Sequence, residues 1–199
     1  MDKKRFNFKI SNRYIDHLIN AILIFASVFM AFWMNEIREK KTQIEYTDKA
    51  KEAVLSELKS NLAVLERWTP YHKNILKARK ELIFKNDTIQ GFKIASIPKL
   101  NNGIQREIIT NSGWGLLVDK QVNFDIQTKL LINRIYEQQE YVTNATSRIT
   151  NDFFNSREIF DTTKTKENYL IFYSFLGELW EQERAMIEGL KYTIEELEN

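Results

Sequence analysis

LINAILIFASVFMAFWM, residues 18–34, is the stretch that decides the fold, because its 17 positions carry no charged side chain. As a helix rising ~1.5 Å per residue it spans about 25 Å, close to a ~30 Å hydrocarbon core. Arg13 and Tyr14 precede the stretch, Trp33 lies at its end and Arg38 follows it. Such residues anchor a helix at both membrane interfaces. The sequence therefore predicts a transmembrane helix over residues 18–34.

Two other interpretations of residues 18–34 stay open. A cleaved signal peptide needs a pair of small residues two positions apart, but Ala31 follows Phe29 and Ser27 follows Phe25 at that spacing. A core helix of a soluble protein usually has a shorter uncharged run. We therefore expect an uncleaved signal anchor.

The charges that flank the apolar stretch predict its orientation. Five cations precede it: Lys3, Lys4, Arg5, Lys9 and Arg13. Four follow it before residue 50: Arg38, Lys40, Lys41 and Lys49. The excess favours a cytoplasmic N-terminus. We expect a short basic cytoplasmic segment (1–17), an inner-membrane helix (18–34) and a periplasmic domain (35–199).

Composition excludes several classes of function. The 199 residues include 29 Lys and Arg and 27 Asp and Glu, a net charge of +2. A nucleic-acid-binding domain is usually far more basic, so we expect no nucleic-acid partner. The chain has no Cys, which excludes disulfides and thiolate metal sites.

Residues 35–85 have a helical pattern. An apolar stripe at spacings of three or four predicts that the anchor helix continues outward: Ile44, Val54, Leu58, Leu62 (or Asn61) and Leu65. Thr69-Pro70 then suits an N-cap and a first helical residue, which predicts a second helix from Pro70 to about Phe84. One kinked helix through Pro70 is the alternative.

Residues 86–118 form the least regular part of the chain. Gly91, Pro98 and Gly103 predict a loop over about 86–103, with room for one hairpin. A short helix is expected over Ile104–Asn111, with Gly113 as its left-handed C-terminal cap.

Two long helices follow, over about 123–156 and 166–197, separated by a polar turn at 161–165. The apolar stripe of the first helix is Ile126, Leu130, Leu131, Ile135, Val142, Ala145, Ile149 and Phe153. The apolar stripe of the second helix is Tyr169, Phe172, Tyr173, Leu176, Leu179, Trp180, Met186, Ile187, Leu190, Ile194 and Leu197. Stripes of this length must be buried, so the fold class is all-α, a bundle of three to four helices.

Motifs of catalysis are missing from the sequence. It has no Glu-x-x-His, His-Glu-x-x-His, phosphate-loop or G-x-S-x-G pattern. We therefore expect no catalytic, cofactor-binding or metal-binding residue and no enzyme, although dispersed carboxylates leave one conceivable. His72 is expected to be an exposed residue rather than a ligand, and the aromatic residues of the last helix are expected to form core.

Asn20, Ser27 and Ala31 share one face of the predicted membrane helix, because they are seven and four positions apart. Small and polar residues on such a face allow another membrane helix to approach closely and to form hydrogen bonds. The alternative is that an anchor simply tolerates single Asn and Ser residues.

Two stretches resemble a family of single-pass membrane proteins of Bacteroidota. One is Ala31-Phe32-Trp33-Met34-Asn35-Glu36-Ile37-Arg38-Glu39-Lys40; the other is Ile108-Ile109-Thr110-Asn111-Ser112-Gly113 with Leu116-Leu117, Asp119, Leu130 and Tyr136. The resemblance implies an inner-membrane anchor with a helical periplasmic domain. The family has no settled activity, so it implies no catalytic residue.

Two functions fit these features. The first is an interaction or scaffold protein, an accessory subunit that contacts lipid and either a protein partner or further copies of itself. The second is a sensory or small-ligand-binding bundle that signals through a partner.

Overall fold

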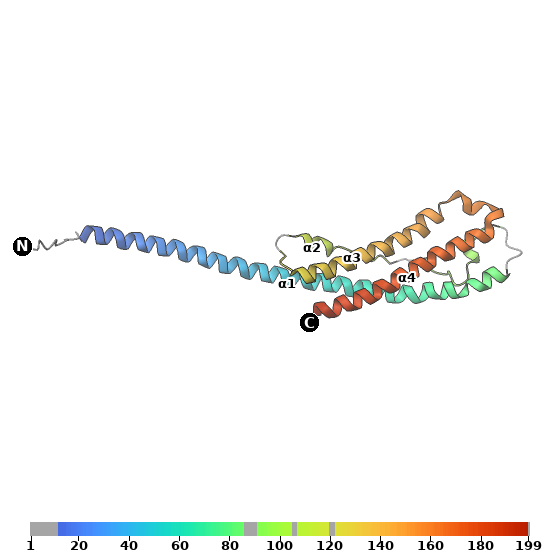
Figure 1. Ribbon diagram of the computed structural model, residues 1–199, viewed down its shortest axis with the longest axis horizontal. Helices are drawn as coiled ribbons and strands as arrows, with labels where there is room; N and C mark the ends of the chain where they lie inside the picture. The colour runs from blue at the N-terminus through green and yellow to red at the C-terminus, as the bar shows by residue number, and fades with distance from the viewer. Residues whose placement is uncertain (1–11, 86–90, 105–106, 120–121, 199) are drawn as a thin grey trace, which may run out of the picture. The chain divides into compact units, whose positions relative to one another are not determined.

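The computed structural model describes residues 12–85, 91–104, 107–119 and 122–198, without the side chains of 12, 14 and 80–85. In these residues the fold is all-α, as predicted, and contains no strand. The α-helices are α1 (Asn12–Lys85), α2 (Trp114–Val118), α3 (Ile126–Ser147) and α4 (Thr165–Glu198) (Figure 1). Short 3-10 turns and one π-helical turn connect them: η1 (Ile94–Ser96), η2 (Arg148–Phe153, π), η3 (Arg157–Phe160) and η4 (Thr162–Lys164).

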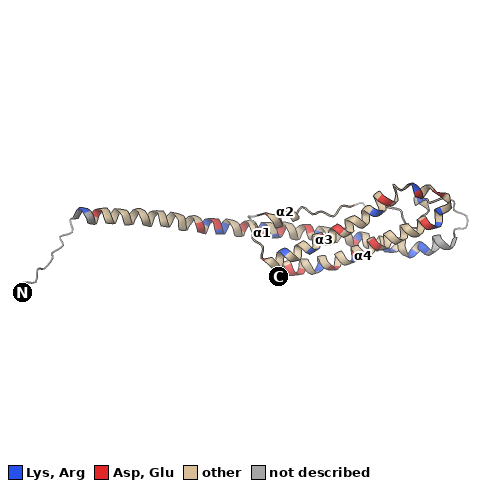
Figure 2. Ribbon diagram, turned by 45° about the horizontal axis from the view of Figure 1, so that its top comes forward, with Lys and Arg blue, Asp and Glu red and all other residues tan. Residues whose placement is uncertain are grey.

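The chain divides into two units, Met1–Tyr46 and Thr47–Asn199. In the N-terminal unit α1 contains an 18-residue window with a mean hydropathy of 1.9, none of it buried. Figure 2 shows the long uncharged stretch of this helix, followed by charged turns. By length and composition this helix is able to cross a membrane, which supports the predicted anchor.

α1 does not end at Pro70, so the predicted break is wrong and the alternative of one helix is the observed one. Thr69 is buried, and its hydroxyl has no hydrogen-bond partner among the described residues, so it does not cap a new helix. Proline removes one helical hydrogen bond, but the flanking side chains of Trp68 and His72 are buried. Tertiary packing therefore keeps the helix continuous through a residue that disfavours it.

The C-terminal unit is built on α3, α4 and the residues of α1 after Tyr46, which lie side by side (Figure 1). Most residues of the predicted stripes lie in its core, and the completely buried ones include Val54, Leu58, Leu65, Val142, Ile149, Phe172, Leu176, Leu179, Met186 and Leu190. Ile75 of α1 and Ile132, which is not in the predicted stripe of α3, are completely buried as well. Ile44, Ile126 and Leu130 belong to the predicted stripes but are exposed. They lie at or beyond the ends of the packed region.

Residues 91–119 differ from the prediction. The described part contains η1 and α2 but no hairpin, and residues 107–111 are not helical. The helix expected over Ile104–Asn111 is wrong, because side chains of α1 and α3 bind the backbone of this segment instead. Gly113 has φ −63°, so it is not a left-handed cap and precedes a helix rather than ending one.

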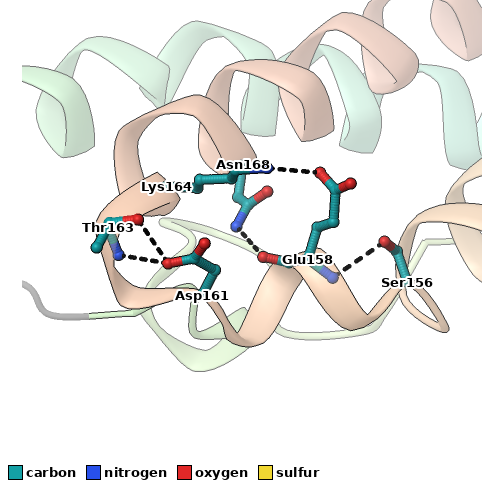
Figure 3. Close-up of polar contacts among 6 residues, drawn as sticks. All are labelled: Ser156, Glu158, Asp161, Thr163, Lys164 and Asn168. Carbon is teal, nitrogen blue, oxygen red and sulfur yellow. Dashed lines mark hydrogen bonds and ion pairs between the residues drawn. The ribbon is translucent and has the colours of Figure 1, made fainter.

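A polar corner between η2 and α4 confirms the predicted turn (Figure 3). Asp161 accepts hydrogen bonds from the backbone N–H and hydroxyl of Thr163, and these bonds lower the pKa of its carboxyl. Asn168 donates to the carbonyl of Glu158, and Lys164 lies 3.2 Å from the Glu158 carboxylate. These contacts fix the point at which α4 begins.

Candidate functional site

The predicted contact face of the membrane helix lies on α1, with Asn20, Ser27 and Ala31 all exposed. The hydroxyl of Ser27 donates to the carbonyl of Leu23 at 2.7 Å. Its hydrogen is therefore used inside the helix, and only its oxygen lone pairs remain for a neighbouring helix.

The predicted interface residues Arg13, Trp33 and Arg38 are also exposed on α1. The side chain of Tyr14 lies outside the described residues. Arg13 and Arg38 are 25 positions apart, about 37 Å along a helix, which leaves room for both side chains to reach an interface.

In the C-terminal unit the most elaborate polar structure surrounds a segment that we call the strap, residues 102–104 and 107–114. The strap runs antiparallel to α1: its first residues bind the later part of α1 and its last residues bind the earlier part. The Asn102 N–H donates to the Tyr71 hydroxyl at 2.9 Å, and Glu107 pairs with Arg67. Side chains of the helices thus supply hydrogen bonds that the backbone of the strap would make within itself if the strap were helical.

Glu57 of α1 binds the end of the strap. Its carboxylate accepts hydrogen bonds from the Ser112 hydroxyl (2.6 Å), the Tyr136 hydroxyl (2.7 Å) and the Gly113 N–H (3.2 Å). Burial, and then the bond to Glu57, raises the pKa of Tyr136 well above its ordinary value. A Cβ on residue 113 would lie 2.3 Å from the Tyr136 hydroxyl oxygen, so only glycine fits there.

Thr110 is held in the middle of the strap by two amide side chains. Asn61 of α1 accepts from the Thr110 N–H at 2.9 Å and donates to its carbonyl at 2.7 Å. Gln139 of α3 donates to the same carbonyl at 3.0 Å. Both backbone groups of Thr110 are therefore satisfied, which is why this residue needs no helix.

His72 and Glu183 form a buried pair between α1 and α4, each with 0% of its side chain exposed. The imidazole Nδ1 lies 2.9 Å and 3.0 Å from the two carboxylate oxygens, and Nε2 contacts the carbonyl of Ile104 in the strap. A carbonyl only accepts, so Nε2 is the donor in this contact. The pair ties three segments together: α1, α4 and the strap.

The prediction that His72 is exposed is therefore wrong. The buried polar residues could have been found, because each interrupts an apolar stripe at helical spacing. In α1, Asn61 lies between Leu58 and Leu65, and His72 lies between Trp68 and Ile75. In α3, Gln139 lies between Ile135 and Val142. In α4, Glu183 lies between Leu179 and Met186. A polar residue at a core position needs a polar partner, which the sequence does not identify.

This network does not resemble an active site. No group of three or more His, Asp or Glu suited to a metal ion occurs among the described residues. One hollow among the described residues is a groove of about 670 Å³ between α1 and α4.

Comparisons of the chain with family models, curated proteins and solved structures found no match.

Proposed function

We propose that this chain is a membrane-anchored helical interaction or scaffold protein, an accessory subunit of an envelope or membrane complex. The observation that carries the proposal is a contrast within α1. Every described side chain from 13 to 45 is exposed, whereas the later part of the same helix is packed into the bundle. An apolar helix with no partner in its own chain suits lipid and the helix of another membrane protein.

The flanking charges support a location in the inner membrane, with the N-terminus cytoplasmic and residues 35–199 periplasmic. Membership of the Bacteroidota family of single-pass proteins agrees with this topology and is part of the proposal. Residues 35–199 carry 24 cations and 25 acids, so the proposed periplasmic domain is nearly neutral. Charge alone would then not select its partner.

Exposed apolar side chains in the C-terminal unit add support. Leu117 of α2 is buried, but Trp114 and Val118 of the same helix are exposed. Ile126 and Leu130 at the start of α3 are exposed as well, at 75% and 52%. Large apolar residues on neighbouring short elements are typical of protein contact surfaces.

The test is affinity purification of the tagged full chain in mild detergent, with mass spectrometry and particle mass. We expect one stoichiometric foreign partner. The double variant Asn20→Leu/Ser27→Leu removes the polar groups of the contact face and should lose that partner. The matched control Ile22→Leu/Phe29→Leu changes the opposite side of the helix, because two residues turn it by about 200°. A lone monomer, or equal recovery with both variants, would contradict the proposal.

A sensory or ligand-binding bundle is the second candidate, and the observation that favours it is the groove between α1 and α4. Its volume lies in the range of small-molecule sites, about 300–1,000 Å³. A signal from such a site would reach the cell through a partner of the anchor. Thermal stabilisation of the full chain by a metabolite would favour this candidate over a pure scaffold.

A further inference from the structure

The groove between α1 and α4 has an unusual charge balance. Lys73, Lys77 and Arg79 of α1 line it, and the lining contributed by α4 includes a single acid, Glu181. Glu181 is already paired with Arg184, at 3.2 Å. Lys77 and Arg79 make no ion pair with any residue whose side chain the structure describes, and the described lining of the groove carries more positive than negative charge.

An aromatic face lies in the same groove. Lys73 places its Nζ 5.6 Å from the centre of the Trp180 ring, and the Arg184 guanidinium carbon lies 5.0 Å from it. Cations beside an indole are attracted to its face. The groove therefore places an indole ring next to several cations.

Gly177 explains why the groove is open. Gly91 and Gly103 have positive φ, and a Cβ on Gly113 or Gly189 would lie within 3 Å of another side chain. Gly177, like Gly115 on α2, has neither reason, since no described atom lies within 4 Å of a Cβ built on it. Glycine inside a helix costs about 1 kcal/mol relative to alanine, and here the bundle gains no contact in return. What the glycine leaves is space in the groove.

We propose that this groove binds a small anionic ligand, an apolar or aromatic body that carries a phosphate, sulfate or carboxylate group. The anionic group pairs with Lys77 and Arg79, and the body lies over Gly177 against the Trp180 ring. Charge-assisted hydrogen bonds give the anion its affinity, and burial of the body against Trp180 selects amphiphilic anions over inorganic ones. This inference does not depend on the interaction function, since the contact face of the anchor is no part of the groove.

Titration calorimetry on the full chain in nonionic detergent tests the proposal with 1-naphthyl phosphate as the probe. Inorganic phosphate supplies the anion alone, and 1-naphthol supplies the body alone. We expect 1:1 binding of naphthyl phosphate, weakened by salt, and binding at least about tenfold weaker for either fragment. Equal binding of 1-naphthol would show a merely apolar surface and would overturn the proposal, as would no binding of naphthyl phosphate.

Two variants locate the binding. Gly177→Leu fills the groove without changing its charge, and Lys77→Gln/Arg79→Gln removes the charge without filling it. Each should weaken naphthyl phosphate binding by about tenfold or more. The matched control is Gly115→Leu on α2, where a Cβ likewise meets no described atom within 4 Å. It should bind as the unaltered chain does, and circular dichroism confirms that each variant is folded.

Unchanged affinity in Gly177→Leu would overturn the site. Affinity purification of the Gly177→Leu variant separates this inference from the interaction function. If the variant loses the probe but keeps the protein partner, both proposals are supported. If it loses the probe and the partner, the partner contact lies in the groove, which contradicts an anionic small ligand as the occupant.

Discussion

The two stretches of α1 share one backbone conformation but differ in what surrounds them. From 13 to 45 all described side chains are exposed, and they include Ile24, Phe25 and Phe32. From 47 onward the helix buries Val54 and Leu58 completely. Apolar residues at three- or four-residue spacing mark the second stretch, and an unbroken apolar run marks the first. The pattern of apolar residues, rather than their number, separates a helix packed on protein from one suited to lipid.

Hydrogen bonds show the same contrast. In the first stretch Ser27, Asn35, Lys40 and Thr42 all bond to groups four residues away in the same helix. In the second, Asn61 bonds to Thr110, 49 residues away, and His72 to Glu183, 111 residues away. These polar groups of the first stretch are thus satisfied within the helix, whereas those of the second stretch hold distant segments together.

The largest expected effect comes from removing one member of the buried pair that holds the second stretch. Glu183→Ala should lower the free energy of unfolding by about 3–5 kcal/mol, because it leaves a buried imidazole without its partner. Urea denaturation of the full chain in detergent, followed by tryptophan fluorescence, measures the loss. The control is Glu36→Ala, an exposed carboxylate of the first stretch that bonds to Lys40, and it should not move the midpoint. Equal denaturation midpoints for the two variants would contradict the distinction between a second stretch that is packed in the bundle and a first stretch that is not.

Matched apolar truncations come next in size. Leu58→Ala deletes a completely buried side chain and should cost about 2–5 kcal/mol in the same denaturation experiment. Ile24→Ala deletes a side chain that is 66% exposed and should leave the unfolding of the bundle unchanged. If Ile24→Ala destabilised the bundle as much as Leu58→Ala, the first stretch would have to pack against protein within the same molecule.

The smallest effect concerns the contact of α1 with the strap. Tyr136→Phe removes the hydroxyl that donates to Glu57 and should cost about 1–3 kcal/mol. In the folded chain burial and Glu57 raise the pKa of Tyr136, whereas the unfolded chain keeps a pKa near 10.0. Stability from this group is therefore complete below pH ~10 and falls as the pH rises further. Denaturation midpoints between pH 8 and pH 11 measure the fall; a fall equally steep in Tyr136→Phe would contradict the assignment.

Much of the fold could be predicted because amphipathic stripes are strong signals. The stripe of α4, from Tyr169 to Leu197, located both the helix and its buried face. Pro70 was misread because local preferences favour a helix start there, and only burial of its neighbours reverses this. The prediction for Gly113 was wrong because glycine is needed there to leave room for the Tyr136 side chain. Tyr136 lies 23 positions later, so local sequence does not show this contact.

Much less of the candidate sites could be predicted. The contact face of Asn20, Ser27 and Ala31 follows from spacing alone and stays a prediction. The buried pair required two residues from different helices, and the sequence does not identify the partner of either one. The groove required Lys77 and Gly177 to be placed opposite each other, which no single stretch of sequence encodes. Pairing between distant segments is the information that local patterns lack.

The separation of His72 from Glu183 also sets an order of events during synthesis. A ribosome adding about 5–20 residues per second needs roughly 6–22 s to make the 111 residues between them. The apolar stretch of α1 has left the ribosome long before that interval ends. During this interval the apolar side of α1 that will face the core is not yet covered by α4, and a chaperone can bind it. The pair between α1 and α4 therefore forms only after the apolar stretch of α1 has been made.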